Sequence, residues 1–112
     1  MIKITDQITT WANMGRFVYY DDKGSIFVGK SDIDNFEKIW LSCLFVKDEY
    51  RHRGIAHQLM DAAITLSKNV GFKEIWLICK KPLVTFYQNF GFTIYAINFD
   101  ENGLTYTMVL EN

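Results

Sequence analysis

The sequence is poor in the residues that mark special classes of protein. It contains one proline, two cysteines and two histidines among 112 residues, and no low-complexity tract or internal repeat. Twelve basic and thirteen acidic residues nearly cancel, so the net charge of −1 gives no reason to expect a nucleic acid partner. The segment Met1–Asp6 lacks the apolar run of a signal peptide or a membrane helix. We therefore expect a folded cytoplasmic protein with no membrane partner.

The two cysteines, Cys43 and Cys79, stand inside apolar runs and form no cluster of the kind that binds a metal. We expect no metal and two reduced, buried thiols of a cytosolic protein. Apolar side chains, by contrast, are plentiful: 49% of the residues are hydrophobic and 16% are aromatic. A chain of this length can therefore fill a dense core as one domain over residues 1–112.

Apolar periodicity predicts a mixed α/β fold. The stretch 38–46 is almost wholly apolar, which suits a central strand buried on both faces. A helical pattern follows it and ends at Gly71, and a second apolar strand comes next. Strand, helix and strand in this order form a right-handed unit with parallel strands. In chain order the expected elements are a hairpin of strands 16–20 and 25–28, a polar loop at 31–35, a strand 38–46, a helix 54–70, a strand 74–79, a helix 82–90 and a hairpin of strands 92–98 and 104–110.

The helix that begins near Gly54 has an unusual start. No Ser, Thr, Asp or Asn stands where a side-chain cap belongs, so its first amides lack an obvious partner. Arg51 and Arg53 add positive charge beside the positive end of the helix dipole, which costs roughly a few tenths of a kcal/mol or more. An anion seated on those amides would remove both faults, and the small residues Gly54 and Ala56 would give it room. From the residues alone, a solvated basic loop is an equal alternative.

Two common phosphate-binding motifs are absent from this loop. It contains neither Gly-x-Gly-x-x-Gly nor Gly-Lys-Ser/Thr, which argues against a dinucleotide fold and a nucleoside triphosphatase. The segment Arg51–Ala56 (RHRGIA) instead resembles Arg/Gln-x-x-Gly-x-Gly/Ala, the pyrophosphate-loop motif of the GNAT acetyltransferases. Phe86–Phe92 (FYQNFGF) is similar to the family's Phe-Tyr-x-x-x-Gly-Phe segment, and Leu83–Gln88 looks closest to the arylalkylamine branch. The resemblance covers roughly residues 16–110.

The resemblance implies an N-acetyltransferase that moves an acetyl group from acetyl-coenzyme A to a primary amine. The amine, on a small molecule or a protein, would attack directly and form a tetrahedral intermediate. The implied fold is a mixed, twisted sheet with flanking helices, whose central parallel strands, 38–46 and 74–79, splay apart to admit the pantetheine arm like an added strand. A binding module that senses acetyl-coenzyme A without acceptor chemistry of its own is the alternative.

The resemblance also implies roles for individual residues. Backbone amides at 53–56 would hold the pyrophosphate, the amide of Leu44 would polarise the acetyl carbonyl, and Tyr87 would give a proton to the departing thiolate. Without the family, Tyr87 would be assigned to core packing, since it shares an apolar helix face with Phe86 and Phe90. The implied cofactor-binding residues are Leu44, Phe45, Val46, Arg51, His52, Arg53, Gly54, Ile55, Ala56, Phe86 and Tyr87, with Leu44 and Tyr87 also catalytic.

The sequence departs from the family pattern at three positions and leaves the general base open. Lys80 and Leu83 stand where many relatives have Asn and Ala, and Asp48 replaces a proline in the loop. Glu37 and His57 are candidate bases for the amine. Each also has a plain interpretation as a surface charge or a cofactor-side residue, and an ordered water would serve equally well.

The front of the chain is shorter than in most relatives, which have a strand and two helices before the first hairpin. Roughly fifteen residues precede Arg16, and we expect them to include a short helix capped by Thr5 or Asp6. That helix would carry Ile8, Trp11 and Ala12 on one side. The acceptor site would then be open to a large substrate, be completed by another subunit, or have lost its chemistry. Because apolar sheet surface would remain uncovered, we expect a homodimer.

Overall fold

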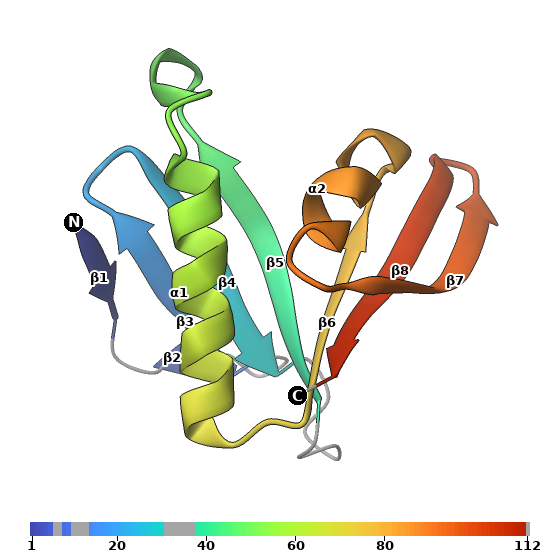
Figure 1. Cartoon of the computed structure of the whole chain (residues 1–112), viewed down its shortest axis with the longest axis horizontal. Helices are drawn as coiled ribbons and strands as arrows, with labels where there is room; N and C mark the ends of the chain where they lie inside the picture. Colours follow the sequence, from blue (N-terminus) through green and yellow to red (C-terminus); the bar gives the residue numbers. More distant parts are fainter. Residues whose placement is uncertain (6–7, 10–13, 31–37, 112) are drawn as a thin grey trace.

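One mixed sheet runs through the protein and carries both helices on the same face (Figure 1). The computed structural model describes residues 1–5, 8–9, 14–30 and 38–111. The strand order is β1-β3-β4-β5-β6-β8-β7, and β2 pairs with the other end of β3. The strands are β1 (Ile2–Ile4), β2 (Ile8–Thr9), β3 (Met14–Tyr20), β4 (Gly24–Lys30), β5 (Lys38–Val46), β6 (Glu74–Cys79), β7 (Thr93–Asp100) and β8 (Gly103–Glu111).

The two α-helices each follow a short 3-10 turn. The turn η1 (Asp48–Tyr50) comes before α1 (Ile55–Val70), and η2 (Lys81–Leu83) leads directly into α2 (Val84–Gln88). The helix expected at 82–90 is therefore shorter than predicted, because Pro82 lies in a 3-10 turn and the chain turns at Gly91, whose φ is 100°. Among the described residues, no helix has the length and apolar character needed to cross a bilayer.

The strands β5 and β6 are parallel, as expected, but they pair over a short distance. Only Lys38, Ile39 and Trp40 have partners on β6, and these are Glu74, Ile75 and Trp76. Beyond these three pairs the strands diverge towards their carboxyl ends (Figure 1). The mixed sheet with splayed central strands, predicted from the sequence, is confirmed.

The prediction that β5 is buried on both faces is wrong, because in its first half only one face is buried and the other is half-buried. Ile39 and Leu41 are buried, whereas Ser42, Cys43 and Phe45 are exposed. The reason is the divergence of the two strands, since β6 no longer covers β5 at these positions. The expected burial of Cys43 is therefore wrong, while that of Cys79 is confirmed.

β5 contains a β-bulge close to the point where it diverges from β6. On the β4 side, Phe27 pairs with Ser42 and Ser25 with Phe45, so one residue of β4 faces two residues of β5. Cys43 takes up the extra length with a φ of 56°, in the left-handed region that a non-glycine residue seldom adopts. The bulge bends β5 at the point where the cleft begins.

The helix expected near the amino terminus is wrong for the part of it that the structure describes. Ile8 lies in strand β2 and pairs with Gly15. Thr5 does not cap a helix, because its hydroxyl accepts a hydrogen bond from the amide of Phe17 at 3.0 Å, which fixes it beside β3. Trp11, Ala12 and the loop expected at 31–35 lie outside the described residues.

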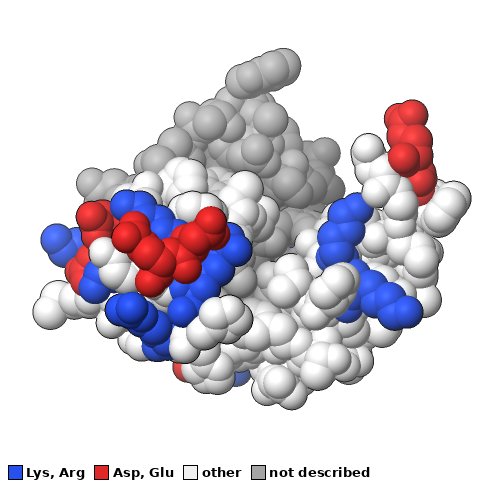
Figure 2. Space-filling view, turned by 90° about the horizontal axis from the view of Figure 1, so that it is seen from above, with Lys and Arg blue, Asp and Glu red and all other residues white. Residues whose placement is uncertain are grey.

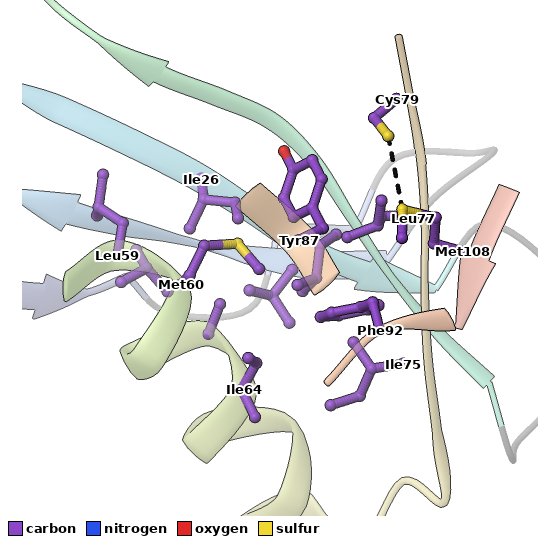
Figure 3. Close-up of a cluster of buried hydrophobic side chains, with 14 of the residues drawn as sticks. Ile26, Leu59, Met60, Ile64, Ile75, Leu77, Cys79, Tyr87, Phe92 and Met108 are labelled. Atoms are coloured by element: carbon purple, nitrogen blue, oxygen red, sulfur yellow. Dashed lines mark hydrogen bonds between the residues drawn. The ribbon is translucent and has the colours of Figure 1, made fainter. Parts of the chain in front are cut away.

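The core lies between the sheet and one face of α1. Leu59, Met60 and Ala63 are fully buried against the inner strands, at the helical spacing expected from the sequence. Phe92 and Tyr87 close this core on the side of α2, next to Met60 (Figure 3). Burying each of these large side chains contributes roughly 1.5–3 kcal/mol, and together they set the position of α2 relative to α1.

Candidate active site

A cleft of about 580 Å³ opens where β5 and β6 diverge. Its volume lies within the range of small-molecule sites. Figure 2 looks onto this end of the molecule: charged side chains gather over the loop after β5 and, on the other side, over the turn after β6, with an uncharged stretch between them. The cleft is lined by Leu44, Phe45, Val46, Tyr50, Arg51, His52, Gly54, Ile55, Ala56, His57, Leu83, Phe86 and Tyr87.

The structure brings together all but one of the predicted cofactor-binding residues. Arg53 is the exception: it does not line the cleft, and its guanidinium lies 5.7 Å from the centre of the Tyr50 ring. Tyr50 was not among the predicted site residues, and Leu83 was named only as a departure from the family pattern. An isolated aromatic residue in a charged loop is part of no helical or strand periodicity. Only its position directly before Arg51 could have indicated that Tyr50 is a site residue.

The start of α1 forms the cleft wall that is rich in free amides. Gly54 is the N-cap, with φ 80°, and no side chain caps the helix or places an acid in its first turn. A Cβ at Gly54 would meet no atom within 4 Å, so the space over the loop is open. Helix amides with no side-chain partner and the positive end of a 16-residue helix thus face the cleft.

Arg51 shapes this loop with its own side chain. Its Nε donates to the carbonyl oxygen of Val46 at 3.1 Å, and its Nη1 lies 3.0 Å from Oδ1 of Asp48. Both partners are exposed, so the ion pair itself stabilises the fold little. The bond to Val46 joins the end of β5 to the loop, and it fixes where the first amides of α1 stand.

The edge of β5 that faces β6 is unpaired along the cleft. Beyond Trp40, no described strand pairs with β5 on that side. Phe45 and Val46 also have partners on β4. Because alternate residues of a strand turn their main-chain groups to opposite edges, part of the main chain at 44–46 faces the cleft without a neighbouring strand. An edge of this kind accepts an extended ligand through backbone hydrogen bonds.

Tyr87 brings a phenol to the opposite wall. The side chain is only 7% exposed and packs against Phe86 and Phe92, with ring centres 5.2 and 6.2 Å away. Its hydroxyl is turned away from Phe92 (Figure 3), and no hydrogen bond joins it to any other described residue. Burial, and secondly the nearby Cys79, raise the pKa of Tyr87 to about 12. The phenol therefore keeps its proton at any ordinary pH.

A smaller cavity of about 260 Å³ adjoins the cleft between the diverging strands. Leu44 and Tyr87 line both spaces, and Cys43, Cys79 and Lys80 line the smaller one. The Cys79 thiol donates to the sulfur of Met108 at 3.7 Å, and burial raises its pKa (Figure 3). Lys80 donates to the carbonyl oxygen of Asn102 at 2.9 Å, which ties the end of β6 to the β7–β8 turn.

Of the two candidate general bases, the structure describes one. His57 lines the cleft, but its Nε2 lies 3.3 Å from Oδ2 of Asp61, and its ring centre lies 4.7 Å from that of Phe90, with the rings tilted by 39°. These contacts place it on the helix side of the cleft, close to the start of α1. Glu37 lies outside the described residues. Within residues 1–5, 8–9, 14–30 and 38–111, no group of three His, Cys, Asp or Glu side chains could hold a metal ion.

The sequence matches one protein family over nearly its whole length. Residues 4–111 fit the family described as "Acetyltransferase (GNAT) domain". None of the curated proteins matches the sequence.

Solved structures with the same fold include proteins named as an acyl-CoA N-acyltransferase and as nourseothricin acetyltransferase. ElaA of Escherichia coli has 25% sequence identity and a TM-score of 0.73, over 91% of this chain and 70% of ElaA. The NatC complex bound to a Gag peptide and CoA contains a chain with 20% identity and a TM-score of 0.74, over 88% of this chain and 70% of that one. Ard1 from Thermoplasma volcanium has 23% identity and a TM-score of 0.70, over 89% of this chain and 70% of Ard1. The last two, at lower identity, establish the shared fold.

Proposed function

The chain belongs to the GNAT acetyltransferase family and is an acyl-CoA-dependent N-acyltransferase, and from this premise we propose that it transfers acetyl from acetyl-coenzyme A to a primary amine. The observation that carries the proposal is the uncapped start of α1, which opens into the cleft beside the unpaired edge of β5. The proposal covers a single catalytic domain over residues 1–112. A cytoplasmic location is part of it, in keeping with two unpaired cysteines.

The residues at the start of α1 fit a pyrophosphate. Amides at 53–56 supply donors, Gly54 leaves space for the phosphate oxygens, and the helix dipole favours their negative charge. We assign His52, Ile55 and Ala56 to the same subsite as cleft-lining residues. Arg51 acts mainly by holding the loop in shape through Val46, and its remaining N–H groups add positive charge nearby.

The unpaired edge of β5 fits the pantetheine arm. Its amide groups can bond to main-chain atoms of Leu44, Phe45 and Val46 in the way of an added strand. Apolar side chains of Leu83 and Phe86 form the facing wall and exclude water from the arm. This arrangement would bring the thioester to the place where Leu44 and Tyr87 line the same space.

The two catalytic roles follow from that position. The Leu44 amide would stabilise the negative charge that develops on the acetyl oxygen, and Tyr87 would protonate the leaving sulfur. With the pKa of Tyr87 at about 12 and that of an ordinary thiol near 8.5, complete transfer to a free thiolate costs roughly 5 kcal/mol. The same burial raises the thiol pKa, which reduces this difference. The proton is therefore best given while the carbon–sulfur bond breaks.

Thiol release from acetyl-coenzyme A tests the proposed reaction. The purified protein is assayed with a panel of primary amines that includes arylalkylamines, polyamines, amino-acid amides and peptides with free amino termini. At least one amine is expected to give free thiol in proportion to acetylated product, identified by mass spectrometry. Cofactor binding without acetylation of any amine in the panel would overturn the proposed acetyl transfer, and would favour a sensor.

A further inference from the structure

The smaller cavity passes through the sheet, from the face under the helices to the opposite face. Successive side chains of a strand point to opposite faces. In and directly after β6, the cavity is lined by Leu77 and Cys79, which are buried in the core, and also by Ile78 and Lys80, which are exposed. The cavity therefore connects the two faces at the gap between β5 and β6. A second molecule can reach the place of the thioester through this gap while the cofactor arm occupies the helix side.

Lys80 is the one basic residue among the described residues that line this cavity, and no Asp or Glu of the described chain lines it. Among the other polar groups, the Tyr87 phenol is uncharged because its pKa is raised to about 12. Burial also raises the pKa of the Cys79 thiol. The rest of the wall is mostly apolar, with Ile26, Leu41, Leu44, Leu77, Ile78 and Leu83. The cavity thus combines an apolar wall with a single ammonium group.

The ammonium group of Lys80 is held in place and keeps donors to spare. Its Nζ donates one hydrogen bond to the carbonyl oxygen of Asn102 at 2.9 Å. An ammonium group has three N–H donors, so two are left beyond this bond. Within the described residues, no carboxylate forms an ion pair with Lys80. Basic side chains are visible on this side of the uncharged stretch in Figure 2. A positioned cation of this kind binds carboxylates through charge-assisted hydrogen bonds.

We propose that the acceptor is a small amino acid, whose carboxylate binds to Lys80 and whose amine reaches the thioester through the gap. This inference rests on the acetyl transfer proposed above. The apolar part of the acceptor lies along Leu41 and Leu77. A cavity of about 260 Å³ has room for roughly eight water-sized groups at about 30 Å³ each, which suits a small amino acid.

Two other occupants fit the cavity less well. A polyamine would bring a second ammonium group close to Lys80, and like charges disfavour each other. A longer acyl chain would contact the apolar wall, but it would make no use of Lys80 and would fill the gap through which the amine has to come. An amine with a carboxylate uses both the apolar wall and the ammonium group.

Initial rates with α-, β- and γ-amino acids and their amides test the proposal. Each kcat/KM is calculated on the concentration of unprotonated amine, so that the two members of a pair differ in the carboxylate alone. In at least one pair the wild type is expected to favour the acid by about tenfold or more, the low end for a hydrogen bond between charged groups. Equal values for acid and amide in every pair would overturn the proposal.

Lys80→Gln removes the charge and keeps an N–H donor for Asn102. The preference for the acid should fall about tenfold, mainly through a higher KM, and Lys80→Arg should restore it. Lys81→Gln is the matched control, because Lys81 is the next residue, is exposed and lines neither cavity. It should keep the wild-type preference. A preference that Lys80→Gln leaves unchanged, or that Lys81→Gln lowers equally, would contradict the assignment of Lys80.

Reversal of the charge gives a gain of activity as a second measure. Lys80→Glu should lose the preference for the acid and should acetylate polyamines at least tenfold better than the wild type does. Hexanoyl-coenzyme A tests the other occupant of the cavity. If the wild type transfers hexanoyl faster than acetyl to the same amine, the cavity holds the acyl chain and the proposal is overturned.

Binding measurements distinguish failure of this proposal from failure of the proposed reaction. Isothermal titration of the preferred amino acid into protein saturated with coenzyme A requires no turnover. Its affinity should fall about tenfold in Lys80→Gln and stay unchanged in Lys81→Gln. This pattern without acetyl transfer would support the carboxylate site and overturn only the reaction. Acetyl transfer to acids and amides alike, with no effect of Lys80→Gln on binding, would overturn the carboxylate site alone.

Discussion

Leu44 and Tyr87 lie on opposite walls of one cleft, and both also line the smaller cavity beside it. The leucine belongs to the bulge of β5, and the tyrosine stands on α2. A stretch of unpaired backbone and a phenol with a firmly held proton therefore meet in one space. Transfer of an acyl group from a thioester needs a donor for the carbonyl oxygen and a proton for the sulfur, and these two residues can supply them.

Tyr87→Phe tests the proton donor. The substitution keeps the ring and its packing against Phe86 and Phe92. Affinity for acetyl-coenzyme A should change little, while kcat should fall about 100-fold, the low end for a lost general acid. Steady-state kinetics with the best amine of the panel measures the effect. With an acyl donor whose thiolate leaves unaided at neutral pH, kcat of the variant should fall much less. Equal losses of kcat with both donors would show that Tyr87 serves only in packing.

The same tyrosine makes the fold less stable in alkali. The pKa of Tyr87 is about 12 in the folded protein against 10.0 for an ordinary tyrosine, so the unfolded chain loses this proton first. The contribution of Tyr87 to the free energy of unfolding is fully present below pH 10. It is lost between pH 10 and 12, and the total loss is roughly 2–3 kcal/mol. Urea unfolding at a series of pH values should show this slope in the wild type and a smaller one in Tyr87→Phe. Tyr95→Phe, at an exposed position, is the control and should keep the wild-type slope.

Gly54→Val tests the phosphate subsite. The wild type should gain on the order of 10 °C in Tm at a cofactor concentration of about 100 Kd. A branched side chain at Gly54 would occupy the open space above the loop and abolish that gain. Gly71→Val is the matched control: Gly71 also has a positive φ and open space, but it caps the other end of α1. It should lower the Tm of the free protein by a similar amount and keep the cofactor-induced shift. An undiminished shift in Gly54→Val would place the cofactor elsewhere.

Arg51→Met and Asp48→Asn together distinguish the hydrogen bond from Arg51 to β5 from the ion pair with Asp48. Loss of the hydrogen bond to Val46 should weaken binding of acetyl-coenzyme A by about tenfold, in line with roughly 1.5–3 kcal/mol for a bond from a charged donor. Asp48→Asn removes only the exposed ion pair and should change affinity less than twofold. Isothermal titration calorimetry compares the two variants. Similar losses in both would show that the ion pair, and not the bond to β5, holds the loop.

The two cysteines should differ sharply in reactivity. Cys43 is exposed at the bulge, whereas Cys79 is buried and burial raises its pKa. Iodoacetamide at pH 8 should label Cys43 at least tenfold faster, because the thiolate is the reactive form. Bound acetyl-coenzyme A should slow labelling of Cys43, which lines the cavity between the strands. Peptide mass spectrometry reads both sites, and Cys43→Ser should leave only the slow reaction.

The central elements could be predicted from the sequence because local pattern decides them. The bounds of β5 and β6 match the expected ones, and α1 begins one residue later than expected. The N-terminal helix could not be predicted correctly, since the apolar spacing around Ile8 allows a helix, and only pairing with the following strand, β3, made this segment β2. The exposure of Cys43 could not be predicted either. An apolar run looks like a buried strand until the divergence of its neighbour is known.

The sequence predicted which residues form the candidate site better than it predicted the role of each residue. The loop motif pointed to the start of α1, and Gly54 stands there without a cap, as expected. The sequence could not reveal that Arg51 turns back to the carbonyl of Val46, because that bond depends on the path of the loop. Nor could it place Tyr50, whose ring centre lies 5.0 Å from Nζ of Lys23 and 5.7 Å from the guanidinium of Arg53.

β5 and β6 pair through only three residues each, so the sheet is split between these two strands. The split in the sheet also separates the first half of the sequence from the second. Every described strand up to β5 lies on one side of the split, and every strand from β6 onward lies on the other. The backbone passes between the two halves at 71–73. A ligand in the cleft touches 44–57 from the first half and 83–87 from the second, so it acts as a bridge between two separately connected parts. Among the described strands, these three residue pairs are the only link within the sheet between the two halves.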